Sequence, residues 1–498
     1  MLRKIRIVLA LVFWIGVTVL FLDATGVVSG WLGWMAKVQF IPAVLALNVG
    51  VIVFLAALTL LFGRVYCSVI CPLGVFQDIA SWLSGLRRGK RFRFGYAKAL
   101  TALRLVMLGV MVGAMIAGIG IIVAVLDPYS AYGRMVSSFL IPAYDWVNSL
   151  LAGAAERADS YMFFDYQYRP TTVATLSVAG ATLVAIVALA WWKGRWYCNS
   201  ICPVGTILGV LSRYALFGVK IDVDKCNSCG LCSRGCKGQC INGKAHEIDN
   251  SRCVGCMDCI DICKHGAISY GRRNRRVDVK TAIPVQDGAD TSRREFLSLA
   301  ALMGTTAAVK GAEKFVDGGL AAIEEKKTPN RETKPVPPGA QGIKHFHDHC
   351  TACQLCVSRC PHGVLTPSTD LDTLLHPEMS FENGYCRPEC NVCSSVCPAG
   401  AIKPVTVEDR TAIQVGHAVW VRDNCVPVSE NLECGNCARH CPAGAITMVP
   451  SEFGNEDSVK IPSVNAERCI GCGACENLCP SRPFSAIYVE GHRNHRVI

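Results

Sequence analysis

Residues 226–236 read Cys226-Asn227-Ser228-Cys229-Gly230-Leu231-Cys232-Ser233-Arg234-Gly235-Cys236, a cysteine motif that recurs with variations six times in this 498-residue chain. Three such closely spaced thiolates hold one [4Fe–4S] cube, and the fourth thiolate binds the neighbouring cube. Structural zinc sites use separated Cys-x2-Cys pairs instead of triplets. A small disulfide framework is not expected either, because the chain is too long for one and the cysteine spacings do not suit it. Iron–sulfur binding is therefore the expected chemistry.

The next copy, residues 253–263, completes a two-cluster unit. We expect the ligand sets to be Cys226, Cys229, Cys232 with Cys263, and Cys253, Cys256, Cys259 with Cys236. Cys240 is left over and is an alternative ligand to Cys236. Lys237 and Lys264 stand where a proline often follows the fourth cysteine. We expect them to be solvated, although a cation there would raise the potential of the adjacent cube.

Four further motifs lie beyond residue 345, and each ends in Cys-Pro. Their cysteines are Cys350, Cys353, Cys356, Cys360; Cys386, Cys390, Cys393, Cys397; Cys425, Cys434, Cys437, Cys441; and Cys469, Cys472, Cys475, Cys479. The second and third of these motifs carry insertions in the first gap, which we expect to form loops that leave the ligands in place. Six motifs predict six [4Fe–4S] clusters.

The N-terminal part has the composition of a membrane protein. Hydrophobic residues make up 51% of the chain, and the mean hydropathy is +0.31. Four uncharged runs approach the roughly 20 residues that cross a bilayer; they are residues 7–22, 38–63, 105–126 and 171–192. Basic residues alternate between the connecting loops, which predicts four spans with both ends in the cytoplasm. A buried soluble helical core is the alternative. The net charge of +11 lies beside these runs, so we attribute it to topology and not to nucleic acid.

A repeat follows the second and fourth runs. Gly63-Arg64-Val65-Tyr66-Cys67-Ser68-Val69-Ile70-Cys71-Pro72-Leu73-Gly74 recurs as Gly194-Arg195-Trp196-Tyr197-Cys198-Asn199-Ser200-Ile201-Cys202-Pro203-Val204-Gly205. The repeat predicts a duplicated helical hairpin with two cysteine pairs at equivalent depth. Together the four thiols could bind a further metal centre, or each pair could cycle as a dithiol. Small buried residues at a structural turn are the third interpretation.

A signal-like segment separates the two groups of motifs. Ser292-Arg293-Arg294-Glu295-Phe296-Leu297 precedes an apolar stretch of residues 298–309, which is typical of a twin-arginine export signal. Clusters are assembled in the cytoplasm, so a domain that carries them has to be exported folded. A basic anchor at the inner face is the alternative. Prolines and charges then predict an extended linker over residues 326–342. We expect His345, His347 and His349 to be solvated, with metal binding as the alternative.

The whole pattern resembles known electron-transfer proteins. The membrane part and the two-cluster unit resemble the NapH-type membrane ferredoxins associated with periplasmic nitrate reductase. The twin-arginine segment and the four-motif tail resemble their NapG-type partner, as if the two proteins were fused. The tail is also similar to the four-cluster subunits of molybdenum oxidoreductases. That resemblance pairs the first tail motif with the fourth and the second with the third. It implies these sets: Cys350, Cys353, Cys356 with Cys479; Cys469, Cys472, Cys475 with Cys360; Cys386, Cys390, Cys393 with Cys441; and Cys425, Cys434, Cys437 with Cys397.

The predicted fold is a membrane α-helical domain with four spans and a duplicated hairpin, plus two α+β bacterial-type [4Fe–4S] ferredoxin domains, the second with four motifs. The expected parts are residues 1–215, membrane domain; 216–280, two-cluster domain; 291–312, signal-like segment; 313–344, linker; and 345–498, four-motif domain. The resemblance implies an inner-membrane protein whose N-terminus and first ferredoxin domain are cytoplasmic and whose second ferredoxin domain is periplasmic. It also implies quinol oxidation and a periplasmic reductase or cytochrome partner. An accessory electron donor for maturation and a cytoplasm-to-periplasm relay remain open.

Haem is not expected, because no histidine precedes His246 and no Cys-x2-Cys-His motif occurs. The bilayer core, roughly 30 Å thick, is too wide for direct electron tunnelling. We therefore expect a mobile quinone or a partner subunit to bridge the two faces. Asp127, Tyr129, Tyr132 and Arg134 are candidates for binding a quinol and accepting its proton, or else they anchor a helix at the interface. No catalytic residue is assigned, since no nucleophile, phosphate loop or carboxylate pair is recognisable.

Overall fold

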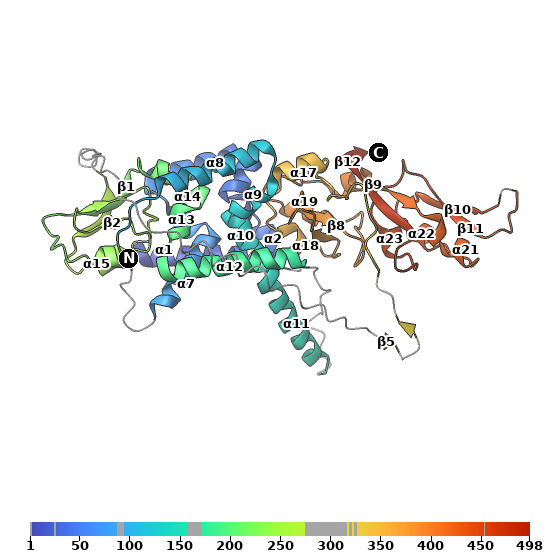
Figure 1. Ribbon diagram of the computed structural model, residues 1–498, viewed down its shortest axis with the longest axis horizontal. Coiled ribbons are helices and arrows are strands. Elements are labelled where there is room, and N and C mark those ends of the chain that lie inside the picture. The colour runs from blue at the N-terminus through green and yellow to red at the C-terminus, as the bar shows by residue number, and fades with distance from the viewer. Residues whose placement is uncertain are drawn as a thin grey trace, which may run out of the picture.

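The computed structural model describes residues 2–23, 26–86, 94–157, 171–273, 316–317, 321–322, 326–452 and 454–498. The molecule is elongated, with a helical domain in the middle and one cysteine-rich domain at each end (Figure 1). We call residues 217–273 the first ferredoxin domain and residues 326–498 the second. They lie at opposite ends of the helical domain. The twin-arginine segment lies outside the described residues.

The helical domain is formed by helices from the first 212 residues. In order they are α1 (Leu2–Leu22), α2 (Val27–Leu32), α3 (Trp34–Lys37), α4 (Phe40–Leu45), α5 (Val49–Phe62), α6 (Val65–Val69), α7 (Pro72–Gly85), α8 (Thr101–Ala117), α9 (Gly120–Leu126), α10 (Pro128–Met135), η1 (Val136–Leu140), α11 (Ile141–Glu156), α12 (Val173–Lys193), α13 (Trp196–Ser200) and α14 (Pro203–Ser212). The π-helical segment η1 joins α10 to α11, which projects away from the body in Figure 1.

By length and composition alone, two described helices, α1 and α12, are long and apolar enough to cross a membrane. The second and third apolar runs are each broken into two helices, unlike the continuous spans that the sequence predicted. Leu47 has a positive φ between α4 and α5, and Asn48 then caps α5. Gly118, also at positive φ, ends α8 before α9 begins. Left-handed residues cannot continue a right-handed helix, so these two residues set the breaks.

The first ferredoxin domain contains β1 (Phe217–Ile221), α15 (Leu231–Gly235), β2 (Ile241–Asn242), β3 (Glu247–Ile248), α16 (Asp258–Ile262) and β4 (Ile268–Arg272). β1 and β4 pair antiparallel from Phe217 opposite Arg272 to Ile221 opposite Ile268. β2 and β3 form a second antiparallel pair. Each motif therefore ends in a short helix beside a small sheet, and the helices α15 and α16 pack together.

The second ferredoxin domain has two such units in tandem. The first contains α17 (Ile343–His349), α18 (Leu355–Arg359), β7 (Leu365–Pro367), β8 (Pro377–Met379), α19 (Val392–Val396) and α20 (Val407–Ala412). The second contains β9 (Ile413–Trp420), η3 (Arg422–Asn424), α21 (Val426–Ser429), α22 (Asn436–Arg439), β10 (Ile446–Pro450), β11 (Lys460–Val464), α23 (Ala474–Asn477) and β12 (Ile487–Val497). Antiparallel pairs join β7 to β8, β10 to β11 and β12 to β9. Two-residue strands β5 (Val316–Asp317) and β6 (Ala321–Ala322) precede this domain.

The proline-rich stretch before α17 is not the extended linker that its composition predicted. Val336 and Ala340 are buried in the core. Lys334 forms ion pairs with Asp370 and Glu378 at 2.9 Å each. The backbone N–H groups of Met379 and Gly491 donate to the carbonyls of Pro335 and Thr333. Apolar burial and these bonds hold the stretch against the second ferredoxin domain, which therefore includes Lys326 onwards among the described residues.

Candidate iron–sulfur centres

Local backbone conformation explains how each regular motif wraps a cluster. In the four motifs with unbroken Cys-x2-Cys-x2-Cys spacing, the residue directly before the second cysteine and the residue directly after it both have a left-handed φ. The pairs are Ser228 and Gly230, Gly255 and Met257, Ala352 and Gln354, and Gly471 and Gly473. Alternating conformations of this kind direct successive N–H groups into a concavity that accepts an anion. The motif is thus shaped for an electronegative cluster before any distant contact is made.

A hollow lies among the cysteines of the first ferredoxin domain. It is lined by Cys253, Cys256, Cys259 and Cys236, the four thiols that the spacing assigned to one cube. Cys240 lines the same hollow, and its Sγ lies 3.5 Å from that of Cys236. Both thiols are therefore within reach of one cluster, and the question of which one ligates stays open between them. The three thiols of the first motif also lie near one another, since Cys232 interacts electrostatically with Cys226 and Cys229.

In the second ferredoxin domain, neighbouring motifs share their fourth cysteines. One hollow is lined by Cys386, Cys390, Cys393 and Cys360, and another by Cys469, Cys472, Cys475 and Cys441. The remaining thiols follow the same rule: Cys397 interacts electrostatically with Cys350, Cys353 and Cys356, and Cys479 with Cys425 and Cys437.

This arrangement corrects the pairing that the resemblance to molybdenum oxidoreductase subunits implied. Cys360 lies with the second tail motif, not the fourth, and Cys441 lies with the fourth, not the second. Cys397 and Cys479 are exchanged in the same way. The reason is packing: α18 lies against α19, and α22 against α23, so each motif meets its nearest neighbour in sequence. The domain is two consecutive units of two motifs each.

The donor set fits iron–sulfur clusters. Burial raises the pKa of Cys437 to about 11 and that of Cys472 to about 12, so these thiols are protonated until a metal displaces the proton. The fourth cysteines of three tail motifs accept backbone hydrogen bonds, as cluster thiolates do: Ala445 N donates to Cys441 Sγ at 3.2 Å, Ala486 N to Cys479 Sγ at 3.3 Å and Ile402 N to Cys397 Sγ at 3.5 Å. Within the described ranges, no three His, Cys, Asp or Glu side chains converge closely enough for a single metal ion.

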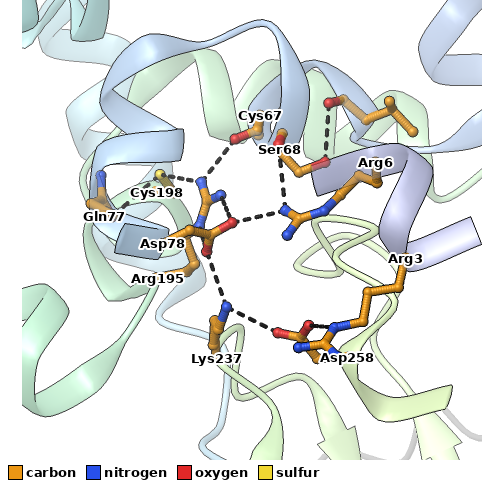
Figure 2. Close-up of polar contacts among 11 residues, drawn as sticks. Arg3, Arg6, Cys67, Ser68, Gln77, Asp78, Arg195, Cys198, Lys237 and Asp258 are labelled. Carbon is orange, nitrogen blue, oxygen red and sulfur yellow. Dashed lines mark hydrogen bonds and ion pairs between the residues drawn. The ribbon is translucent and has the colours of Figure 1, made fainter. Parts of the chain in front are cut away.

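A charged network docks the first ferredoxin domain onto the helical domain (Figure 2). Asp78 of α7 accepts two hydrogen bonds from Arg195, at 2.9 and 2.8 Å, and one from Arg6, at 2.8 Å. Lys237 lies 3.6 Å from Asp78 and 2.9 Å from Asp258, so it is not the solvated lysine that the sequence suggested. Burial alone would lower the pKa of Lys237, but the two carboxylates raise it above its usual value. The first domain is therefore held through paired charges.

The two Cys-x3-Cys-Pro copies interlock, and we call Cys67, Cys71, Cys198 and Cys202 the four-thiol site. Arg64 Nη2 donates to the carbonyl of Cys198 at 3.1 Å, and Arg195 Nη1 donates to the carbonyl of Cys67 at 2.8 Å. Each arginine also lies 3.7 Å from the Sγ of the cysteine three residues after it. The equivalence of these contacts is the structural counterpart of the sequence repeat. Sequence reasoning overlooked both arginines, although their identical place in the repeat was a usable signal.

We call Asp127, Tyr129, Tyr132 and Arg134 the polar core. The sequence placed these residues at a membrane interface, but all of α10 is buried. Tyr132 Oη lies 2.6 Å from Thr18 Oγ1 of α1. Arg134 Nη1 donates to the carbonyl of Ala352 at 3.4 Å, which places the core beside the motif that begins at Cys350. The second ferredoxin domain covers this surface and so removes it from solvent.

The histidines before Cys350 are also packed. His347 Nδ1 lies 2.6 Å from His376 Nδ1, and their rings stack with centroids 4.9 Å apart. Burial and the nearby charges of His347 and Arg134 lower the pKa of His376 to about 3. His347 and His376 therefore pack against the helical domain beside Gly120 and are not part of a solvated linker.

Comparison with known proteins supports electron transfer. A 4Fe–4S binding domain matches twice, over residues 44–91 and 175–223, around the two Cys-x3-Cys-Pro copies. A further 4Fe–4S binding domain matches residues 246–269. A 4Fe–4S dicluster domain matches residues 432–482, which hold most of the third and all of the fourth tail motif. That match treats these two motifs as one two-cluster unit, as the structure does.

The chain is similar to three relatives over part of its length. An uncharacterized protein of Methanocaldococcus jannaschii is 33% identical over 19% of this chain and 37% of its own length. The Escherichia coli protein YccM, whose full name is "Putative electron transport protein YccM", is 23% identical over 53% of this chain and 70% of its own length. The ferredoxin-type protein NapH of Haemophilus influenzae is 27% identical over 47% of this chain and 71% of its own length. The chain is similar to ferredoxin-type electron transport proteins, and its apolar helices together with these relatives indicate a membrane protein.

Proposed function

We propose that this chain is a membrane-anchored polyferredoxin that carries electrons from the quinol pool to a periplasmic reductase or cytochrome. It would hold six [4Fe–4S] clusters, two in the first ferredoxin domain and four in the second, and would span the membrane four times. In this proposal the first ferredoxin domain faces the cytoplasm, and the second is an exported NapG-like unit fused behind the NapH-like part.

The observation that carries the proposal is the position of the two ferredoxin domains at opposite ends of one helical domain. Helix α1 contacts both domains, so its length gives the separation between them. Arg3 at its start pairs with Asp258 of the first domain, and Asp23 just past its end pairs with Arg359 of the second. At 1.5 Å per residue, the 21 residues of α1 span about 31 Å. That length matches the hydrocarbon core of a bilayer, roughly 30 Å.

The polar core supports oxidation of a quinol beside the second ferredoxin domain. Tyr129 Oη and Arg134 Nε and Nη2 are buried and have no hydrogen-bond partner among the described residues. Unpaired buried donors are costly, so a ligand or water that accepts these bonds would stabilise the site. A quinol head group presents such oxygens, and Asp127 would accept its proton. Tyr129 interacts electrostatically with Cys353 and Cys397, so the cluster proposed for these thiols would lie next to the site.

The test uses the complete protein in liposomes with reduced quinol in the bilayer. We expect quinol to bleach the visible absorption of the clusters, and Arg134→Gln to abolish that reduction while dithionite still reduces the same clusters. Tyr144→Phe, on the exposed helix α11, is the control and should behave as the unaltered protein. If quinol reduces no cluster in the unaltered protein, quinol is not the donor.

A second function is a relay of low-potential electrons from a cytoplasmic donor to the outside. The close docking of the first ferredoxin domain favours it, because the carbonyls of Lys237 and Gly238 accept hydrogen bonds from Arg195 N and Asn199 Nδ2, in the same segment as Cys198. Reduction of the second ferredoxin domain by a soluble ferredoxin, without quinol, would support the relay. An accessory role in the maturation of an oxidase or reductase has no comparable structural observation in its favour.

A further inference from the structure

The four-thiol site has the surroundings of bound thiolates and not of inert thiols. Cys67 and Cys198 each lie beside a fully buried guanidinium, of Arg64 and Arg195. Two buried arginines need anionic partners, yet Asp78 is the only carboxylate that the described contacts place on either of them, and it serves Arg195. Thiolates would supply the missing negative charge beside Arg64. A buried cation without a counter-charge is strongly destabilising.

The other two thiols begin helices. Cys71 is the N-cap residue of α7, which has 14 residues, and Cys202 is the N-cap residue of α14, which has 10. Gly205 N donates to Cys202 Sγ at 3.5 Å. The positive end of a helix favours thiolate over thiol. A Cβ at Gly74 would lie 2.2 Å from the carbonyl oxygen of Cys67, and one at Gly205 would lie 2.1 Å from that of Cys198. Only glycine at these two positions therefore allows the two cysteines of each pair to lie close together.

Four soft thiolates with two cationic neighbours fit an iron–sulfur centre. Cys202 interacts electrostatically with the other three thiols, so all four belong to one site. Like the ferredoxin thiols, they do not converge on a single-ion position within the described ranges. Asn199, the residue after Cys198, links the site to the hollow of the first ferredoxin domain, since its Nδ2 donates at 3.0 Å to the carbonyl of Gly238, a residue of that lining.

On its other side the four-thiol site meets the polar core. Tyr66 and Tyr197, each one residue before a thiol, interact electrostatically with Asp127. Asp127 and Arg134 are then adjacent to Tyr129 and Cys353. Helix α1 contacts both sites and so gives the separation between them. Its Arg6 is level with the four-thiol site, because Arg6 Nη1 lies 3.4 Å from the carbonyl of Ser68. Its Thr18 is level with the polar core, because Thr18 contacts Tyr132. These levels are about 18 Å apart at 1.5 Å per residue.

We infer that the four-thiol site holds a seventh iron–sulfur centre, which passes single electrons between the first ferredoxin domain and the polar core. The cysteines stay bound as thiolates throughout, so one iron of the accepting cluster is reduced as one iron of the donating cluster is oxidised. No bond forms or breaks, and no further reactant is needed. The inference rests on the proposed function only in that it takes the clusters of the two ferredoxin domains from it. It replaces the expectation that no electron carrier lies between the faces in this chain.

The first experiment measures iron and acid-labile sulfide in the full-length protein. Six cubes account for about 24 iron atoms, and we expect a content above that value. The double variant Cys67→Ser/Cys198→Ser should lose the excess and keep the rest. Ser68→Ala is the matched control, because its buried hydroxyl only donates to the carbonyl of Val65. An iron content no higher than the value for six cubes would overturn the inference. So would zinc in place of the additional iron, or a disulfide within either cysteine pair detected by mass spectrometry.

The second experiment tests electron flow, with the full chain in liposomes that expose the first ferredoxin domain. Dithionite outside the vesicles should reduce clusters of the second ferredoxin domain in the unaltered protein, and the double variant should lose this reduction. Quinol should still reduce the second domain in the variant, which separates this inference from the proposed function. If the double variant does not fold, paramagnetic resonance of the unaltered protein replaces it. Spectra that contain six reduced clusters and no seventh centre contradict the inference.

Discussion

The two ferredoxin domains meet the helical domain in different ways. The first is held by a chain of charges: Arg3, Asp258, Lys237 and Asp78 follow one another across the interface. The second has one buried ion pair, between Asp23 and Arg359, and is otherwise held by close packing, in which a Cβ on Gly133 would lie 2.4 Å from the carbonyl oxygen of Cys353. A charged interface responds to salt and to the removal of one partner, whereas a packed one responds to added volume. The difference predicts which perturbation detaches which domain.

Asp78→Asn should have the largest effect on this comparison. Burial alone would raise the pKa of Asp78, but Arg195 and Lys237 hold it well below its usual range, so the group is ionised. Its loss leaves buried cations unpaired and should lower the stability of the first interface by about 3–5 kcal/mol. Thermal loss of cluster absorption measures this, with the exposed Asp224→Asn as control. Equal loss in both variants would contradict a central role for Asp78.

Gly133→Ala should act on the second interface alone. The added methyl group would overlap the carbonyl of Cys353 and the ring of Phe21, 2.7 Å away. Overpacking of this size costs about 1–3 kcal/mol. The second ferredoxin domain should become accessible to protease while the first stays protected. Gly113→Ala on α8, where a Cβ meets nothing within 4 Å, is the matched control and should leave both domains protected.

Acid should weaken the second interface through His376. Its pKa is about 3 in the folded protein against an ordinary 6.5, so between these values only the unfolded chain takes up the proton. Stability is therefore greatest above pH 6.5 and should fall by up to about 1.4 kcal/mol per pH unit below it. His376→Gln should flatten this dependence, measured as protease sensitivity of the second domain, and the exposed His440→Gln should leave it unchanged. An unaltered slope in His376→Gln would assign the acid sensitivity to another group.

Arg3→Gln should have the smallest effect. Its ion pairs with Asp258 and Asp261 are 2.8 and 2.9 Å long, but the arginine side chain is 40% exposed. Exposed pairs contribute about 0–1 kcal/mol and are screened by salt. We expect a small loss at low ionic strength that disappears at high ionic strength, measured on the first domain by the same thermal assay. A loss that persists in high salt would show that Arg3 acts through packing.

Much of the site could be predicted from local sequence. The triplet Cys253, Cys256 and Cys259 shares one hollow because the backbone between close cysteines has few ways to turn. The equivalent places of Arg64 and Arg195 likewise follow from the repeat. The partner of each fourth cysteine could not be predicted in this way. Cys360 and Cys441 each end a motif and are each followed by proline, so local sequence does not distinguish them. Only the packing of α18 on α19 and of α22 on α23 distinguishes their partners.

Local sequence was enough to predict the number of cysteine motifs, the chemistry of their thiols and the apolar character of the first 212 residues, because these depend on composition and short-range spacing. The tertiary structure alone decided which motifs share cavities, that Lys237 pairs with two carboxylates, and that Val336 packs in a core instead of a linker. It also brought Cys67 beside Cys198, 131 positions apart in the numbering. Contacts of this kind are chosen by how whole elements pack, and no local pattern encodes that choice.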